Sequence, residues 1–214
     1  MKILDFQTSK NLLSKYNIPF CRSELVGTKE EAIEVAQKIG YPVVLKISSP
    51  DIIHKTEIGG VKAQIGNSAE LSLSWDEIMN SVKSVTSNID GMLVQNKVLG
   101  NKVVIGMKRD PQFGPVIMFG LGGIFIEIIK DVTFRVAPVS EGEAIKMIKE
   151  IRGYPILEGA RTNKPSNIKK IAEIIAALSK FSLAEEKIKE IDLNPVIADK
   201  EQALVVDARF LIDE

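Results

Sequence analysis

Residues 43–60 read VVLKISSPDIIHKTEIGG, an apolar run followed by a polar segment that ends in two glycines. The apolar part, from Pro42 to Ile47, is typical of a β-strand, and the turn-forming residues after it predict a loop. Lys46 stands near the end of this strand, where its ammonium group could meet an anionic phosphate. A lysine that only extends to solvent from a strand end is an equal alternative.

The single histidine of the chain, His54, lies in this loop among charged neighbours. Imidazole is a good nucleophile near neutral pH and can carry a phosphoryl group, and a polar loop would let it move between donor and acceptor. A solvent-facing histidine without a chemical role is the alternative. Because there is only one histidine, metal sites built from several histidines are excluded.

Hydrophobic periodicity and capping signals extend the prediction in both directions along the chain. Thr28 and Glu31 form a capping-box pattern, which Ser140 and Glu143 repeat later. The predicted helices are 5–16, 28–40, 71–82, 140–151 and one from about 166; the predicted strands are 92–98, 103–107, 116–119, 124–136, 188–198 and 203–210. Because strands and helices mix without strict βαβ alternation, we expect an α+β fold, with a hinge at 96–101.

The segment EIDLNPVIA at 190–198 places Glu190, Asp192 and Asn194 on one face of a strand. A hairpin through the turn at 199–201 would bring Asp207, in VVDAR at 205–209, close to Asn194. Carboxylate and amide oxygens, completed by water and phosphate oxygens, suit Mg²⁺. An exposed sheet face without a metal is the alternative.

The segment FGLGG at 119–123 could bring backbone N–H groups close to phosphate oxygens, or it could simply reverse the chain. It matches neither the Walker A motif nor GxGxxG. Glu127, Asp131 and Arg135 after it could line a site or lie on an exposed strand face. The chain has no GxSxG or CxxC motif, so nothing indicates a serine-hydrolase nucleophile elbow.

The composition indicates a soluble globular protein: 45% of the residues are hydrophobic, 26% are charged, and the formal net charge is zero. This balance gives no broad electrostatic case for nucleic acid or an anionic membrane. No apolar run approaches the roughly 20 residues of a membrane span. The polar N-terminus and the single cysteine, Cys21, fit a cytoplasmic protein.

Several segments, in order along nearly the whole chain, resemble a known family. They are LLSKYNIP, KIGYPVVLK, SPDIIHKTEIGGVK, KRDPQFGPVIMFGLGGIFIE, RVAP, and EIDLNPV with VVDAR. Together they resemble the β subunit of ADP-forming acetate–CoA ligase, an ATP-grasp protein similar to the nucleotide-binding part of succinyl-CoA synthetases. The resemblance implies an ATP-grasp fold of two α+β lobes clamping a nucleotide, which we expect at residues 1–97 and 98–214.

The resemblance also implies roles for individual residues. Lys46 becomes the phosphate-contacting lysine, and the strand at Gln95 to Val98, including Asn96, becomes the adenine-facing hinge. His54 becomes a phosphohistidine on a loop that swings between subunits. Asn194 and Asp207 become Mg²⁺ ligands, with Asp192 close by.

The implied reaction converts acyl-CoA, ADP and phosphate reversibly to acid, CoA and ATP. Phosphate passes from acyl phosphate to a histidine of an α subunit, then to His54, then to ADP. Nothing in this sequence looks like the CoA-binding α part, so we expect a separate α chain, in an α2β2 assembly. A labile phosphohistidine must be shielded from water while it is loaded.

The sequence departs from its relatives at Asn96 and Lys102, where glutamate is common, so ATP/ADP and GTP/GDP both stay open as substrates. In GARTNKP, Ala160 and Thr162 depart from the usual pattern, and Arg161 is assigned no role. Two other functions compete: an ATP-grasp carboxylate–amine ligase, which needs no histidine carrier, and a regulatory nucleotide-binding module. The acyl acid and the physiological direction are left open by the sequence.

Overall fold

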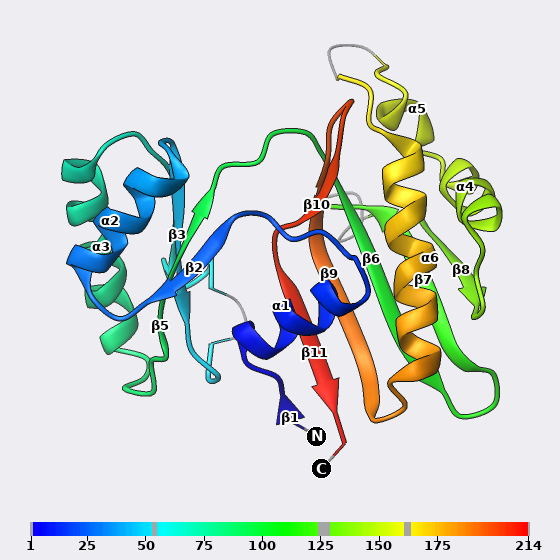
Figure 1. Cartoon of the computed structure of the whole chain (residues 1–214), viewed down its shortest axis with the longest axis horizontal. Helices are drawn as coiled ribbons and strands as arrows, with labels where there is room; N and C mark the ends of the chain where they lie inside the picture. Colours follow the sequence, from blue (N-terminus) through cyan, green and yellow to red (C-terminus); the bar gives the residue numbers. More distant parts are fainter. Residues whose placement is uncertain (1, 53–54, 124–128, 161–163, 214) are drawn as a thin grey trace. The chain divides into compact units, whose positions relative to one another are not determined.

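The computed structural model describes residues 2–52, 55–123, 129–160 and 164–213 (Figure 1). The chain divides into two compact units, one of Cys21–Lys97 and the other of Met1–Phe20 with Val98–Glu214. Both combine helices with antiparallel strands, which confirms the expected α+β class. The boundary after Lys97 falls where we expected the hinge.

The smaller unit is built on a four-stranded antiparallel sheet with the order β2-β5-β3-β4. Its strands are β2 (Ser23–Val26), β3 (Val43–Ser48), β4 (Val61–Ile65) and β5 (Gly91–Asn96). Two helices, α2 (Lys29–Ile39) and α3 (Ser68–Lys83), cover one face of this sheet (Figure 1). Their buried side chains form one core with alternate residues of β3 and β5, including Leu45 and Val94.

Both helices of the smaller unit begin at side-chain caps. The Thr28 hydroxyl accepts the Glu31 N–H, and the Glu31 carboxylate accepts the Thr28 N–H, so the predicted capping box is present. Gly40, with φ of +92°, ends α2, as the sequence predicted. The Asn67 amide oxygen accepts the Glu70 N–H to start α3.

The larger unit contains a sheet whose seven described strands follow the order β1-β11-β9-β6-β7-β8, with β10 also paired to β9. The strands are β1 (Lys2–Ile3), β6 (Asn101–Asp110), β7 (Gly114–Leu121), β8 (Val132–Val136), β9 (Ile188–Ala198), β10 (Ala203–Val205) and β11 (Ala208–Ile212). The predicted strand at 203–210 is therefore divided at Val206 and Asp207.

The helices of the larger unit are α1 (Phe6–Lys15), α4 (Glu141–Glu150), α5 (Tyr154–Leu157) and α6 (Ile168–Ala184). The predicted apolar face of α6 is buried at Ile171, Ile175 and Leu178 against side chains of the sheet such as Phe119 and Leu193. One hydrophobic core therefore joins the helices to a single face of this sheet.

The first 20 residues belong to the larger unit, whereas we expected them in the first lobe. Strand β1 pairs with β11, and Leu13 of α1 is fully buried in the larger core. The Tyr16 ring meets the Phe181 ring edge-to-face at 4.7 Å, and its hydroxyl donates to Glu185 at 3.0 Å. These contacts reach across the whole sequence, so local patterns did not reveal them.

Strands β2 and β4 were not predicted. Each is short, and neither shows the clean alternation of a long half-buried strand. Both form because β5 or β3 offers them a hydrogen-bonding edge, which is a tertiary effect.

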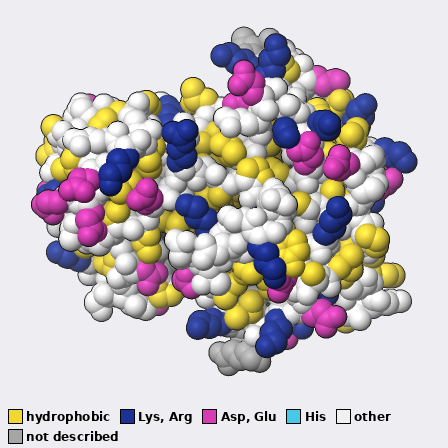
Figure 2. All heavy atoms as spheres, in the orientation of Figure 1, with side chains coloured by type: hydrophobic (Ala, Val, Ile, Leu, Met, Phe, Trp, Pro, Cys, Tyr) yellow, Lys and Arg dark blue, Asp and Glu magenta, His cyan; other side chains and the backbone are white. Residues whose placement is uncertain are grey.

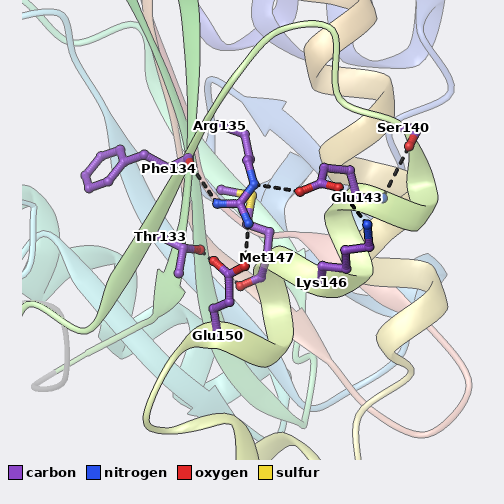
Figure 3. Close-up of polar contacts among 8 residues, drawn as sticks. All are labelled: Thr133, Phe134, Arg135, Ser140, Glu143, Lys146, Met147 and Glu150. Carbon is purple, nitrogen blue, oxygen red and sulfur yellow. Dashed lines mark hydrogen bonds and ion pairs between the residues drawn. The ribbon is translucent and has the colours of Figure 1, made fainter.

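Arg135 of β8 ties this edge strand to α4 (Figure 3). Its Nε donates to Glu143 at 2.8 Å, and its Nη2 donates to Glu150. Ser140 caps α4 by accepting the Glu143 N–H, as predicted, but the Glu143 carboxylate is directed to Arg135 and Lys146. Hydrogen bonds from Arg135 and then Lys146 lower the pKa of Glu143.

Asp131 has a similar structural role at the start of β8. Its two carboxylate oxygens accept the backbone N–H groups of Arg152 at 2.9 Å and Gly153 at 2.7 Å. Asp131 therefore holds the connection between α4 and α5. The contacts of Asp131 and Arg135 favour a role in holding the fold over a role in lining a ligand site. Glu127 and Arg161 lie outside the described residues.

Basic and acidic side chains are interspersed over the face shown in Figure 2, which fits the net charge of zero. Across the helices that the structure describes, none combines the length and the apolar character needed to cross a membrane.

Replacing Arg135 by Met should lower the free energy of unfolding at neutral pH. The folded-state pKa of Glu143 is depressed, so its stabilising contribution is present above the unfolded-state pKa and is lost as the pH falls through the folded-state pKa. The difference between the Arg135→Met variant and the parent should therefore shrink in acid. Urea unfolding of both proteins at several acidic pH values would measure this difference in the free energy of unfolding.

Lys149→Met is the matched control, because it removes one positive charge from the last turn of α4, the helix that carries Glu143. Within the described residues Lys149 makes no ion pair, so its loss should be small and nearly independent of pH. Equal losses in the two variants, or an Arg135→Met loss that persists in acid, would contradict the ion-pair interpretation.

Candidate functional site

The register of β3 and β5 brings Lys46 and Gln95 to one face of the smaller sheet. Lys46 pairs with Leu93, which lies two residues before Gln95, so the two polar side chains are diagonal neighbours. Leu45, next to Lys46, points instead into the core under α2 and α3. The polar pair therefore lies on the sheet face opposite the helices.

Lys46 and Gln95 are buried, with exposed fractions of 8% and 1%. Ser23, which pairs with Gln95 on β2, is also buried. Taking an ammonium group out of water is costly unless anionic or hydrogen-bonding partners surround it. An ammonium, an amide and a hydroxyl on one sheet face provide the chemistry that a phosphate-bearing ligand requires.

Asn96 and Val98 lie where the chain leaves β5 and enters the larger unit. The Asn96 N–H donates to the Arg22 carbonyl at 3.0 Å, and the Lys97 N–H donates to the Pro42 carbonyl at 3.3 Å. The side-chain Oδ1 of Asn96 is buried and accepts no hydrogen bond from the described part of the chain. Because its N–H is already used, Asn96 would have to contact a nucleotide through other atoms.

The loop that contains His54 is closed by its two glycines, although His54 itself lies outside the described residues. The Gly60 N–H donates to the Lys55 carbonyl at 2.7 Å, and the Ile47 N–H donates to the Gly60 carbonyl at 2.9 Å. A Cβ atom on Gly60 would lie 2.7 Å from Ile47 Cγ2. Only glycine allows this close approach of the loop to β3.

Asn194 and Asp207 are brought together at the end of the C-terminal hairpin. The Asn194 N–H donates to the Asp207 carbonyl at 3.1 Å. The alternation of β9 buries Leu193 and leaves Asn194 exposed, while Asp207 occupies the break between β10 and β11. The two residues are neighbours, as the predicted hairpin requires.

Asp192 lies on the same face of β9 as Asn194 and pairs with Arg209 of β11. Burial raises the pKa of the Asp192 carboxyl; the positive charge of Arg209 opposes this rise, and the carboxylates of Glu190 and Asp207 add to it. Arg209 also donates to Glu190 at 3.2 Å. A bound cation would offset the repulsion among these carboxylates. Arg209 lies within VVDAR, but its pairing with β9 depends on the tertiary structure and was not predicted.

The oxygen donors at this corner fit a hard divalent cation such as Mg²⁺. Asn194 and Asp207 would supply two ligands, with Asp192 beside them. In the part of the chain that the structure describes, no three Asp, Glu, His or Cys side chains converge to hold a metal. The protein shell is thus incomplete, and water and phosphate oxygens would have to complete it.

The glycines of FGLGG serve strand packing and a turn as far as the structure describes them. A Cβ on Gly120 would lie 2.8 Å from the Asp131 carbonyl oxygen, so this glycine permits close approach of β7 to β8. The Gly122 N–H donates to the Lys102 carbonyl at 2.9 Å, and Gly123 has φ of +66°. The Gly122 N–H is therefore already used within the protein.

The chain is similar to known proteins along almost its whole length. Residues 1–212 match a family described as ATP-grasp domain. The β subunit of ADP-forming acetate–CoA ligase I of Pyrococcus furiosus is 46% identical over 207 residues, which cover 95% of this chain and 89% of that subunit. ADP-forming acetate–CoA ligase I of Archaeoglobus fulgidus is 43% identical, and there the match covers 30% of the longer protein.

Two solved structures of Candidatus Korarchaeum cryptofilum acetyl-coenzyme A synthetase 1, described as dinucleotide forming, also match. The structure in complex with coenzyme A and Ca-AMPCP has a TM-score of 0.95 and 42% identity, covering 99% of this chain and 94% of that chain. The structure with Mg-AMPPCP, whose phosphohistidine segment points towards the nucleotide-binding site, has a TM-score of 0.85 and 41% identity, covering 98% and 92%.

The family match over almost the full length and the high identity to subunits of similar length confirm the expected ATP-grasp fold. This chain therefore belongs to the ATP-grasp family and, within it, to the β subunits of ADP-forming acetate–CoA ligases.

Proposed function

We propose that this chain is the nucleotide-binding β subunit of an ADP-forming acyl-CoA synthetase and transfers phosphate between a histidine carrier and ADP or ATP. The observation that carries the proposal is the 46% identity to the Pyrococcus furiosus β subunit across 95% of this chain. The polar residues on the sheet faces opposite the helices support it, because their types suit a magnesium nucleotide.

In this proposal Lys46 contacts phosphate oxygens, and Gln95, Asn96 and Val98 contact the nucleoside. A buried lysine and glutamine can hold an anionic, hydrogen-bonding ligand in one orientation. Asn194 and Asp207 hold Mg²⁺, with Asp192 on the same face of β9 beside Asn194. When bound, the ion neutralises phosphate charge and helps the terminal phosphoryl group to transfer.

His54 is the proposed carrier. In the direction of ATP synthesis, an oxygen of the ADP β-phosphate bonds to the phosphorus of phospho-His54 as the N–P bond breaks and its electron pair stays on the ring nitrogen. A proton carried by the other ring nitrogen leaves the imidazole neutral, and ATP is formed. In reverse, an imidazole nitrogen bonds to the γ-phosphorus and ADP leaves. A phosphohistidine segment is named in a related structure, at 41% identity.

The second half of the reaction requires a partner. The name of the Pyrococcus furiosus relative describes a β subunit, and the match covers only 30% of the longer Archaeoglobus fulgidus ligase. We therefore propose a separate α subunit that binds CoA and the acyl group, an α2β2 assembly, and a cytoplasmic location. Acetate is the proposed acid because both relatives are named for it.

His54→Ala should abolish labelling of the protein by Mg-ATP that carries a labelled γ-phosphate. The parent should acquire label that is lost in acid and retained in alkali, as expected for a phosphorus–nitrogen bond. Thr56→Ala, two residues away in the same loop, is the control and should keep the label. Gel autoradiography after acid and alkali treatment would measure the label that each protein retains.

Each outcome separates the competing functions. ATP binding without label on the parent, even with the α subunit present, would overturn the carrier mechanism and favour a regulatory module. Full catalytic activity of the His54→Ala variant would favour a carboxylate–amine ligase, whose acyl phosphate needs no histidine carrier.

Asp207→Asn should weaken the binding of Mg-ADP by about tenfold, because it removes one negative ligand from the metal. Binding of ADP in the presence of a chelator should stay unchanged. Titration calorimetry with and without Mg²⁺ would measure both affinities.

Glu190→Gln is the control for general charge, since Glu190 lies on the same face of β9 but pairs with Arg209. It should change the Mg-ADP affinity less than Asp207→Asn does. Equal weakening of ADP binding with and without metal in the Asp207→Asn variant would exclude a ligand role for Asp207.

A further inference from the structure

The alternation of β11 places Arg209 on the same sheet face as the proposed metal corner. Phe210, the next residue, is fully buried in the core of the larger unit, so Arg209 points to the face opposite the helices. Arg209 is directly opposite Asp192 in the pairing of β11 with β9. Asp207 is two residues before Arg209, and an extended chain spans at most about 3.6 Å per residue. The Arg209 side chain therefore begins within about 7 Å of a proposed metal ligand.

The guanidinium group of Arg209 is only partly used within the protein. Such a group presents its N–H donors in a fixed plane and has no acceptor. Its Nη2 donates to the Glu190 carboxylate at 3.2 Å, and across the described residues this is its one hydrogen bond. The Arg209 side chain is 38% exposed, so a ligand can reach the remaining donors. Glu190 thus holds one edge of the group and leaves the rest available.

The formal charges at this corner require a further cation beside any bound phosphate. Three carboxylates lie here, from Glu190, Asp192 and Asp207. They would repel an anionic phosphate, and the two positive charges of Mg²⁺ do not balance three negative ones. Arg209 supplies the missing positive charge. With the ion and the guanidinium group in place, the corner is formally neutral towards an approaching phosphate.

A purely structural role for Arg209 is the alternative, in which it only pairs with Glu190 to hold β11 against β9. An ion pair as exposed as this one adds little to stability. The two strands are already joined by backbone pairing from Ala208 to Ile212. The exposed donors and the local charge therefore favour a role in binding a ligand.

We propose that Arg209 binds phosphate oxygens of the magnesium nucleotide directly, and that Glu190 orients its guanidinium group. The planar fork of arginine matches phosphate oxygens with short, charge-assisted hydrogen bonds. Such a contact holds the phosphate against the metal corner and stabilises the charge of the phosphoryl group during transfer. The inference rests on the proposed function, because it assumes that this corner receives a magnesium nucleotide.

The test compares two substitutions of Arg209 with a matched control. Arg209→Met removes the charge and all donors, whereas Arg209→Lys keeps the charge and loses the planar fork. Lys108→Met is the control, because Lys108 is an exposed cation on the same sheet face, opposite Glu190. In the part of the chain that the structure describes, Lys108 makes no ion pair. Urea unfolding would verify that each variant is folded.

We expect Arg209→Met to weaken the binding of Mg-ADP by about tenfold to a hundredfold, the size expected for hydrogen bonds to a charged partner. Arg209→Lys should fall between this variant and the parent. Lys108→Met should stay within about twofold of the parent. Adenosine, which carries no phosphate, should bind all four proteins equally. Titration calorimetry would measure the binding of Mg-ADP, and ligand-observed NMR that of adenosine.

Removal of the metal separates a direct phosphate contact from an effect through the metal ligands. The loss in Arg209→Met should persist for ADP in a chelator, whereas Asp207→Asn should then bind ADP like the parent. A loss that disappears in the chelator would overturn the direct contact. Parent-like binding of Mg-ADP by Arg209→Met would overturn it too.

Two further outcomes concern the control ligand and the control variant. An equal loss of adenosine binding in Arg209→Met would indicate general damage to the fold, and an equal loss of Mg-ADP binding in Lys108→Met would indicate a general charge effect. Either result would overturn the inference. A parent that fails to bind Mg-ADP would overturn the proposed function as well, so the two failures are distinguishable.

Discussion

The larger unit depends on the two-residue alternation of β9, the strand that pairs with β6, β10 and β11. This alternation sends Ile191 and Leu193 into the core and leaves Asp192 and Asn194 on the opposite face. A shift of one residue in register would bury the polar pair and expose the apolar pair. The hydrophobic core and the proposed metal corner are therefore fixed by the same backbone hydrogen bonds.

The smaller unit follows the same rule on a different sheet. Leu45 and Val94 pack under α2 and α3, so the neighbouring Lys46 and Gln95 must point to the other face. In both units the helices cover one sheet face, and the residues proposed for ligand binding lie on the other. Strands hold such side chains more rigidly than loops, which suits contacts to a nucleotide and a metal.

The described residues on either side of His54 are held by contacts different from those of the two sheets. Gly60 closes one end through backbone hydrogen bonds and a contact that leaves no room for a Cβ atom. Asp51 holds the other end through side chains of a separate segment.

Much of the fold and the site could be read from local sequence. The caps at Thr28 and Ser140 and the alternation around Asp192 are local because each partner lies within four residues or on the same strand. The segments that carried the family resemblance are also contiguous, and the comparisons confirmed that family. The role of His54 stays a prediction, since it lies outside the described residues.

Other features were decided only by tertiary structure. The first 20 residues join the larger unit, and β2 and β4 become strands, because distant segments supply their pairing edges. Arg135 turned out to bind α4, and Asp51 found its partner 35 positions away. Sequence determined what each segment can form, through propensity and alternation. Tertiary structure decided which segments meet, because those contact energies arise between residues far apart in the chain.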